Sequence, residues 1–134
     1  MSVAVALNNT ILPDPVDCTQ QQICVDGTLT LTGNYGGAAT HGDTMSFAGM
    51  DAIKSNQVPN LVEIFEAPAA GNAPTGFLFA FGYGTTQANG VLIVMQDGAA
   101  AGPEAELTQG AAYPAALLAA TANLRFRAWF PRSI

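Results

Sequence analysis

The segment Leu124-Arg125-Phe126-Arg127-Ala128-Trp129-Phe130 decides the class of fold, because its residues alternate strictly in character. Successive side chains of a β-strand point to opposite faces of the sheet. We therefore expect a strand whose core face is formed by Leu124, Phe126, Ala128 and Phe130. The two arginines and the tryptophan then share the opposite, outward face.

The segment Thr28-Leu29-Thr30-Leu31-Thr32 alternates in the same way, with its leucines predicted to face the core. We expect strands over 22–31, 43–47, 61–65, 76–83, 91–96 and 124–130, with a weaker candidate over 2–7. Seven or eight short strands at a spacing of about ten residues are typical of a sandwich or barrel. The pattern predicts an all-β fold, a jelly-roll-like antiparallel β-sandwich, with an immunoglobulin-like sandwich as the alternative.

Short helical turns complete this prediction. A helical turn is expected over 103–107, where a proline and two acids stand at the favoured N-terminal positions. The segment 114–120 is rich in alanine and leucine, and we expect a short helix or an extended segment there.

The segments 76–83 and 91–96 are apolar or small on both of their faces. Phe77, Phe79, Phe81 and Tyr83 share one face of the first segment, and Leu78 begins the other. Strands of this kind are typical of the middle of a sheet that is covered on both sides. We interpret the aromatic row as core rather than as the wall of a ligand pocket.

The length of 134 residues predicts one folded domain. We expect residues 1–21 to form an extended N-terminal arm, since Pro13 and Pro15 interrupt regular structure. Residues 22–134 form the predicted sandwich, and the strand candidate in the arm could pair with another subunit. The N-terminus has no basic region and no cleavage site of a signal peptide, so we expect the chain to fold in a cytoplasm.

The charge of the chain excludes several classes of partner. Only 10% of the residues are charged, whereas an average domain carries about 25%. Ten acidic and four basic residues give a net charge of −6, which argues against nucleic-acid binding. No apolar run approaches the roughly 20 residues that span a bilayer, so no membrane partner is expected.

The inventory of reactive side chains argues against an enzyme. His41 is the only histidine, and we interpret it as a solvated loop residue. Cys18 and Cys24 are six positions apart, which fits neither a redox pair nor half a zinc site, and we expect free thiols, with a disulfide between the two as the alternative. The serines lack the elbow motif of a hydrolase. Neither the acidic pairs Glu63/Glu66 and Glu104/Glu106 nor the trio Asp14, Asp17 and Asp26 has the context of a catalytic or calcium site. We therefore predict no catalytic residue, metal or cofactor.

The basic residues gather near the C-terminus. Arg125, Arg127 and Arg132 fall in the last ten residues beside Trp129, which the strand pattern turns outward. Arginine and tryptophan are enriched at the hot spots of protein interfaces. We take these four residues as a candidate interface at a basic edge of an acidic protein. Ordinary surface arginines on a terminal strand are an equally good interpretation.

The order of segments resembles the small jelly-roll cement or decoration proteins of tailed-bacteriophage capsids. The resemblance rests on Asp26–Tyr35, Gly102–Leu107, Ala112–Ala116 and Leu124–Ala128. It implies a structural protein that binds the outer surface of the capsid and clamps neighbouring major capsid subunits. The implied partners are the major capsid protein and further copies of this chain, in a trimer rather than a dimer. The implied location is the capsid surface of the virion, after synthesis in the host cytoplasm.

A second function class is a small carbohydrate- or receptor-binding β-sandwich module of a phage tail or fibre. Such a module exposes several aromatic side chains, and the candidates here are Trp129, Tyr35 and Tyr113. Glycan binding would favour this class, and stable association with assembled capsids would favour the decoration class. A small enzyme is the least favoured class, given the residues present.

Overall fold

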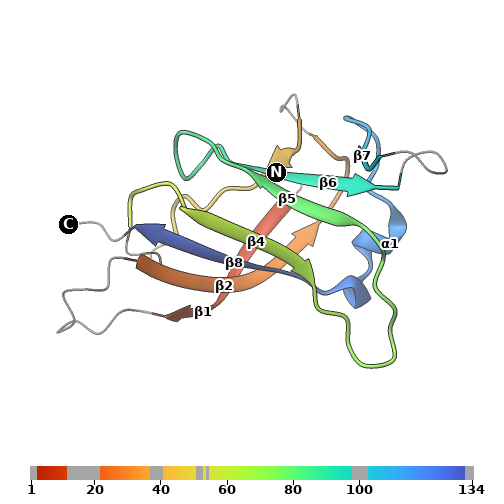
Figure 1. Ribbon diagram of the computed structural model, residues 1–134, viewed down its shortest axis with the longest axis horizontal. Helices are drawn as coiled ribbons and strands as arrows, with labels where there is room; N and C mark the ends of the chain where they lie inside the picture. Colours follow the sequence, from red (N-terminus) through yellow and green to blue (C-terminus); the bar gives the residue numbers. More distant parts are fainter. Residues whose placement is uncertain are drawn as a thin grey trace.

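Two antiparallel sheets pack face to face in this protein (Figure 1). The computed structural model describes residues 3–11, 22–36, 41–50, 53, 55–97 and 103–131. The first sheet has the order β1-β2-β8-β4, formed by β1 (Val3–Ile11), β2 (Gln22–Leu31), β8 (Leu124–Pro131) and β4 (Leu61–Glu66). The second sheet places β6 (Val91–Gln96) between β3 (Asp43–Thr44) and β5 (Leu78–Gly82), and β7 (Ala105–Glu106) also pairs with β6. The predicted all-β sandwich is confirmed.

Strand β8 is the central strand of the first sheet. The chain returns from the second sheet to place β8 between β2 and β4, a long-range connection typical of Greek-key and jelly-roll sandwiches. The alternation predicted from the sequence is observed, because Leu124, Phe126, Ala128 and Phe130 are all buried. The opposite face of β8 is directed away from the core.

The core between the sheets is centred on Phe47, which follows β3 and is fully buried. Its ring centroid lies 5.4 Å from that of Phe126 and 5.3 Å from that of Phe130, both on β8. It also lies 6.0 Å from the ring centroid of Phe81 on β5. The contacts with Phe126 and Phe130 are edge-to-face, which adds favourable quadrupole interactions to the burial of apolar area. Phe47 therefore joins the two sheets.

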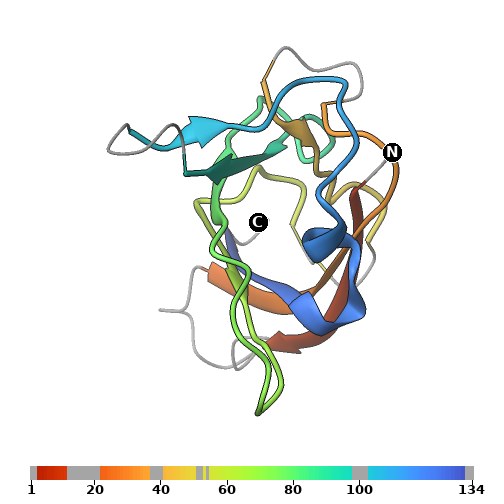
Figure 2. The ribbon, with the colours of Figure 1, turned by 90° about the vertical axis from the view of Figure 1, so that its right-hand side faces the viewer.

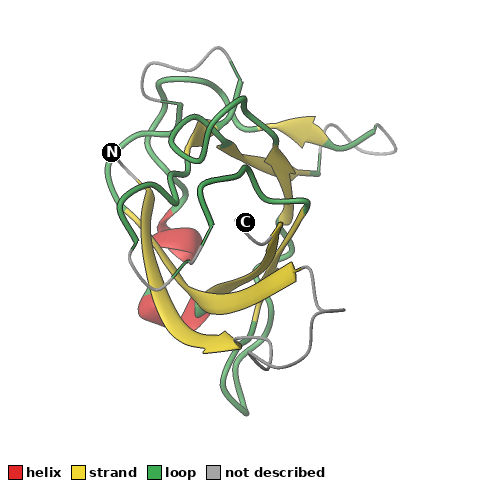
Figure 3. Ribbon diagram, turned by 90° about the vertical axis from the view of Figure 1, so that its left-hand side faces the viewer, coloured by secondary structure: helices red, strands yellow, loops and turns green. Residues whose placement is uncertain are grey.

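The two sides of the sandwich are closed differently. On one side β4 lies against β5, and the backbone N–H of Val62 donates to the Tyr83 hydroxyl at 3.2 Å (Figure 2). The other side holds α1 (Ala115–Leu118) and the 3₁₀ turn η1 (Ala120–Ala122), drawn in red in Figure 3. Leu117 on α1 is buried in the core. Of the two alternatives expected over 114–120, a short helix or an extended segment, the structure has a helix over Ala115–Leu118, which ends where Ala119 becomes extended.

The prediction of a helical turn over 103–107 is wrong, because this segment contains the strand β7. Ala105 and Glu106 pair with Gln96 and Met95 of β6. The backbone N–H of Leu107 donates to the Val94 carbonyl at 3.0 Å, which extends the contact with β6. Tertiary pairing with a neighbouring strand overrides the local helical signal of the proline and the acids.

The position of the strand over 76–83 also differs from the prediction. Phe77, Phe79 and Phe81 pack against the core, as expected. However, β5 is the end strand of the second sheet and not a covered central strand. Leu78, on its other face, is 50% exposed.

The boundary of the predicted arm is corrected as well. β1 pairs antiparallel with β2 along most of its length, from Val3 opposite Leu31 to Ile11 opposite Cys24. Val3 is buried in the common core. Residues 3–11 are extended, as expected, but they belong to the first sheet of their own chain because their apolar face completes its core. Residues 12–21 lie outside the described ranges.

The central position of Phe47 predicts a large cost for its removal. Phe47→Ala should lower the free energy of unfolding by about 3–5 kcal/mol, because it leaves a cavity between three rings. Phe65→Ala is the matched control, since Phe65 is 41% exposed outside the core and should cost less than about 1 kcal/mol. Urea unfolding of both variants measures the difference. Equal losses would show that Phe47 does not join the sheets.

Candidate interaction surfaces

Three of the four predicted interface residues share the outer face of the first sheet. Arg125 and Arg127 are exposed on β8, and Trp129 is half-buried beside them. Arg132, the fourth, lies outside the described residues. The prediction of a basic edge is wrong, because β8 is flanked by β2 and β4. The arginines therefore lie on a face of the sheet and not at its edge.

Acidic residues flank the arginines across the strands. Arg127 lies opposite Asp26 on β2 and opposite Glu63 on β4. Its Nη2 is 3.8 Å from Asp26 Oδ2. Glu63 is exposed, as the alternation of its strand predicts. An exposed ion pair of this length contributes little to stability, so it mainly orients the guanidinium on the surface.

Apolar side chains surround this charged row. Leu61 lies opposite Trp129 and is 46% exposed, and Phe65 lies opposite Arg125. A shallow hollow of about 270 Å³ opens between Phe65 and the two arginines. Cys24 lies opposite Trp129 on the other side, with a free thiol whose pKa is raised mainly by burial. The face therefore combines aromatic and aliphatic side chains with charged groups of both signs.

The outer face of the second sheet is different, because the strand register places only apolar side chains or glycine on β5 and β6. Three cross-strand pairs form it: Leu78 with Met95, Ala80 with Ile93, and Gly82 with Val91. Leu78 is half exposed, and the other five residues are partly buried. We call these six residues the apolar face. No described helix or strand lies outside it in Figure 2.

The sequence predicts the apolar character of this face, but it does not predict that the face is uncovered. Strands that are apolar on both faces predict a sheet with two covers. Within the described residues, the first sheet covers only the inner face, where Leu92 and Val94 are buried. The outer face therefore stays apolar without a second cover among the described residues, and it is a candidate surface for contact with another molecule.

A polar cluster joins two loops at one end of the second sheet. The Glu106 carboxylate accepts hydrogen bonds from the Tyr35 hydroxyl at 2.7 Å and from the Gly42 backbone N–H at 2.7 Å. Gln109 Nε2 donates to the same carboxylate at 3.0 Å, and His41 Nδ1 lies 2.9 Å from its second oxygen. His41 is a largely exposed loop residue, as expected, but it has this carboxylate as its partner.

The electrostatics of this cluster indicate a structural role. Desolvation raises the pKa of the Glu106 carboxyl, but the four hydrogen bonds together outweigh it and lower the pKa to about 2. Burial, reinforced by the bond to Glu106, raises the pKa of the Tyr35 hydroxyl above its usual value. Glu106 is thus held as an anion and Tyr35 as a neutral donor, and neither is poised to exchange a proton near pH 7.

Two of the three aromatic candidates for glycan binding lie inside the protein. Tyr35 and Tyr113 are buried, and their ring centroids are 5.6 Å apart in an edge-to-face arrangement. The Tyr113 hydroxyl donates to the buried Asp43 carboxylate at 2.7 Å. Trp129, the third candidate, is half-buried on the outer face of the first sheet.

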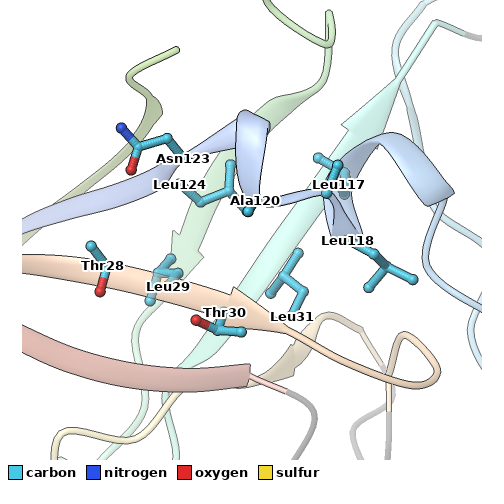
Figure 4. A pocket seen from close by; sticks show the side chains of 10 residues that line it. Thr28, Leu29, Thr30, Leu31, Leu117, Leu118, Ala120, Asn123 and Leu124 are labelled. Carbon is cyan, nitrogen blue, oxygen red and sulfur yellow. The ribbon is translucent and has the colours of Figure 1, made fainter. Parts of the chain in front are cut away.

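A second hollow of about 300 Å³ lies between β2 and the helical segment (Figure 4). Its lining combines buried leucines, Leu29 and Leu31 from β2 and Leu117 from α1, with the polar residues Thr28, Thr30 and Asn123. Leu118 is exposed beside it. The lining residues carry no charged side chain, so the hollow offers apolar contact and neutral polar groups but no group for acid–base chemistry.

The remaining candidate acids do not converge. Glu66 accepts a hydrogen bond from the Thr75 backbone N–H at 2.8 Å. Asp14 and Asp17 of the weighed calcium trio, and Cys18, are outside the described residues. Within the described ranges, no three histidine, cysteine or acidic side chains gather as metal ligands would. The same ranges contain no helix with the length and apolar character needed to cross a membrane.

Comparison with family models, curated proteins and solved structures found no match to this chain. The functional argument therefore rests on the residues and on the two outer faces.

The Glu106 cluster predicts an acid-sensitive contribution to stability. The Glu106 carboxyl has a pKa of about 4.3 in an unfolded chain and of about 2 in the fold. Its contribution to the free energy of unfolding is therefore present above about pH 5 and is lost as the pH falls toward 2. Glu106→Gln should lower the free energy of unfolding at pH 7 by about 2 kcal/mol. The difference from the parent protein should shrink at pH 2.5. Urea unfolding at both pH values measures it, and an equal difference at the two values would contradict this role.

Proposed function

We propose that this protein is a structural virion protein that binds the outer surface of a phage capsid and clamps neighbouring major capsid subunits. The observation that carries the proposal is the apolar face, the six apolar or glycine residues on β5 and β6, on a protein of net charge −6. Burial of such a surface against another protein removes apolar area from water, at about 25 cal/mol per Å². The partner we propose, the major capsid protein, is the one that the resemblance to phage cement proteins implies.

The sandwich architecture supports a clamp because its two outer faces point in opposite directions. The face around Trp129 and Arg127 lies on the first sheet, and the apolar face lies on the second. One rigid molecule can therefore contact two neighbours at once. Many such molecules on one shell add stability through multivalency, even when each contact is weak.

The alternative is a carbohydrate- or receptor-binding module. It has less support, because two of its three aromatic candidates, Tyr35 and Tyr113, are buried. Its expected behaviour is also different: it predicts sugar binding that depends on Trp129 and no dependence on the apolar face. The two proposals therefore differ in the face that each one requires.

Three matched variants test the proposal on assembled particles of the major capsid protein encoded in the same genome. Leu78→Asp alters the apolar face, and Leu61→Asp alters the face around Trp129. Each places a charge in a contact that excludes water, so binding should weaken by about 10- to 100-fold. Co-sedimentation over a range of protein concentrations measures the affinity.

Leu118→Asp is the control for these variants, since Leu118 on α1 is 44% exposed and belongs to neither face. Its affinity should stay within about twofold of the parent protein, because a change at a non-contacting surface position is nearly neutral. The proposal is contradicted if the parent protein fails to sediment with the particles. It is also contradicted if only Leu118→Asp releases the protein.

A further inference from the structure

The outer edge of β1 is a backbone edge that no described strand pairs with. β1 is the first strand in the sheet order β1-β2-β8-β4, so half of its backbone N–H and C=O groups point away from the sheet. The opposite end of the same sheet is different, because β4 lies against β5 and a Val62 backbone donor is taken by Tyr83. β1 is therefore the open end of the first sheet.

This edge lacks most of the features by which proteins block unwanted strand pairing. The strand reads Val-Ala-Val-Ala-Leu-Asn-Asn-Thr-Ile, with no charged residue, proline or glycine among its nine positions. Charged residues and prolines are the common guards of edge strands. A shift in the register between Leu7 and Asn9 interrupts the pairing with β2, so the regular part of the edge is Val3–Leu7.

The segment Val3–Leu7 is complementary to itself in the antiparallel direction. Two copies centred on Val5 place Val5 opposite the partner's Val5, Val3 opposite the partner's Leu7, and Ala4 opposite the partner's Ala6. Val3, Val5 and Leu7 pack toward the core, and Ala4 and Ala6 are exposed on the outer face. The cross-strand pairs on the core face therefore join branched aliphatic side chains, and those on the outer face join alanines.

We propose that β1 pairs with β1 of a second copy of this chain and forms a symmetric dimer. The pairing joins the two first sheets into one continuous sheet with both cores on the same side. It also satisfies the open backbone groups and covers the exposed parts of Val5 and Leu7. A strand that pairs with its own copy about a twofold axis closes at two subunits. The open edge thus favours the dimer over the trimer that the resemblance implies.

This dimer is expected to be weak, because a five-residue strand pair buries less than the roughly 1,200 Å² of a stable interface. We expect a dissociation constant on the order of 10–100 µM for the purified protein without capsids. Sedimentation equilibrium of the parent protein between about 5 and 500 µM should show a monomer–dimer equilibrium. A monomer throughout this range, or a trimer, would overturn the proposal.

Charge variants at the two exposed alanines test the register. Ala4→Lys/Ala6→Lys places like charges directly opposite each other, so the dissociation constant should rise by about tenfold or more. Ala4→Glu/Ala6→Glu should have the same effect. An equimolar mixture of the two variants should dimerise again, since opposite charges then face each other across the strands.

The matched control is Ala105→Lys/Ala116→Lys, which adds the same charge at two exposed alanines away from β1. Its dimerisation should equal that of the parent protein. Dimers that persist in both charge variants, or a mixture that stays monomeric, would overturn pairing through β1. These measurements contain no capsid, so their outcome is independent of the proposed capsid binding.

Discussion

The pleat of β8 is the constraint on which the rest of the structure depends. Strict alternation in this central strand sends Phe126 and Phe130 to Phe47 in the core. The same alternation sends Arg127 and Trp129 to the outer face, between residues of β2 and β4. A slip of one residue would exchange the two sets and place charged groups in the core. One register thus defines the core and one surface together.

The alternating segments of the sequence predicted the strands of the first sheet and its core residues. Side-chain period is a local property, so the outward position of Arg125 and Trp129 followed from it. Strand order depends on contacts between distant segments. For this reason the sequence led to the wrong predictions that β8 lies at an edge and that β5 is a covered central strand. The short strand β7 was missed because pairing with β6 and the contacts of Glu106 decide its conformation. The sequence of residues 103–107 predicts neither contact, because the partners lie in other segments of the chain.

The two outer faces have different physical characters, and the proposed function uses them as two distinct contact surfaces. The face of the first sheet offers Arg127 with its acidic neighbours and an aromatic ring, so it can discriminate partners by geometry and charge. Hydrophobic contact at the apolar face would be non-directional, so it would contribute to affinity more than to specificity. Glu106, held as an anion by its donors, stabilises the end of the second sheet that carries this face.

Hydroxyl-radical footprinting of the protein bound to assembled capsid particles tests the central claim most directly. The claim is that both outer faces are contact surfaces, so oxidation of Trp129 and Phe65 on the first sheet should fall on binding. Oxidation of Leu78 on the second sheet should fall with them, while exposed Leu118 on α1 should react as it does in the free protein. Protection of Leu118 with unchanged reactivity at Trp129, Phe65 and Leu78 would contradict the account.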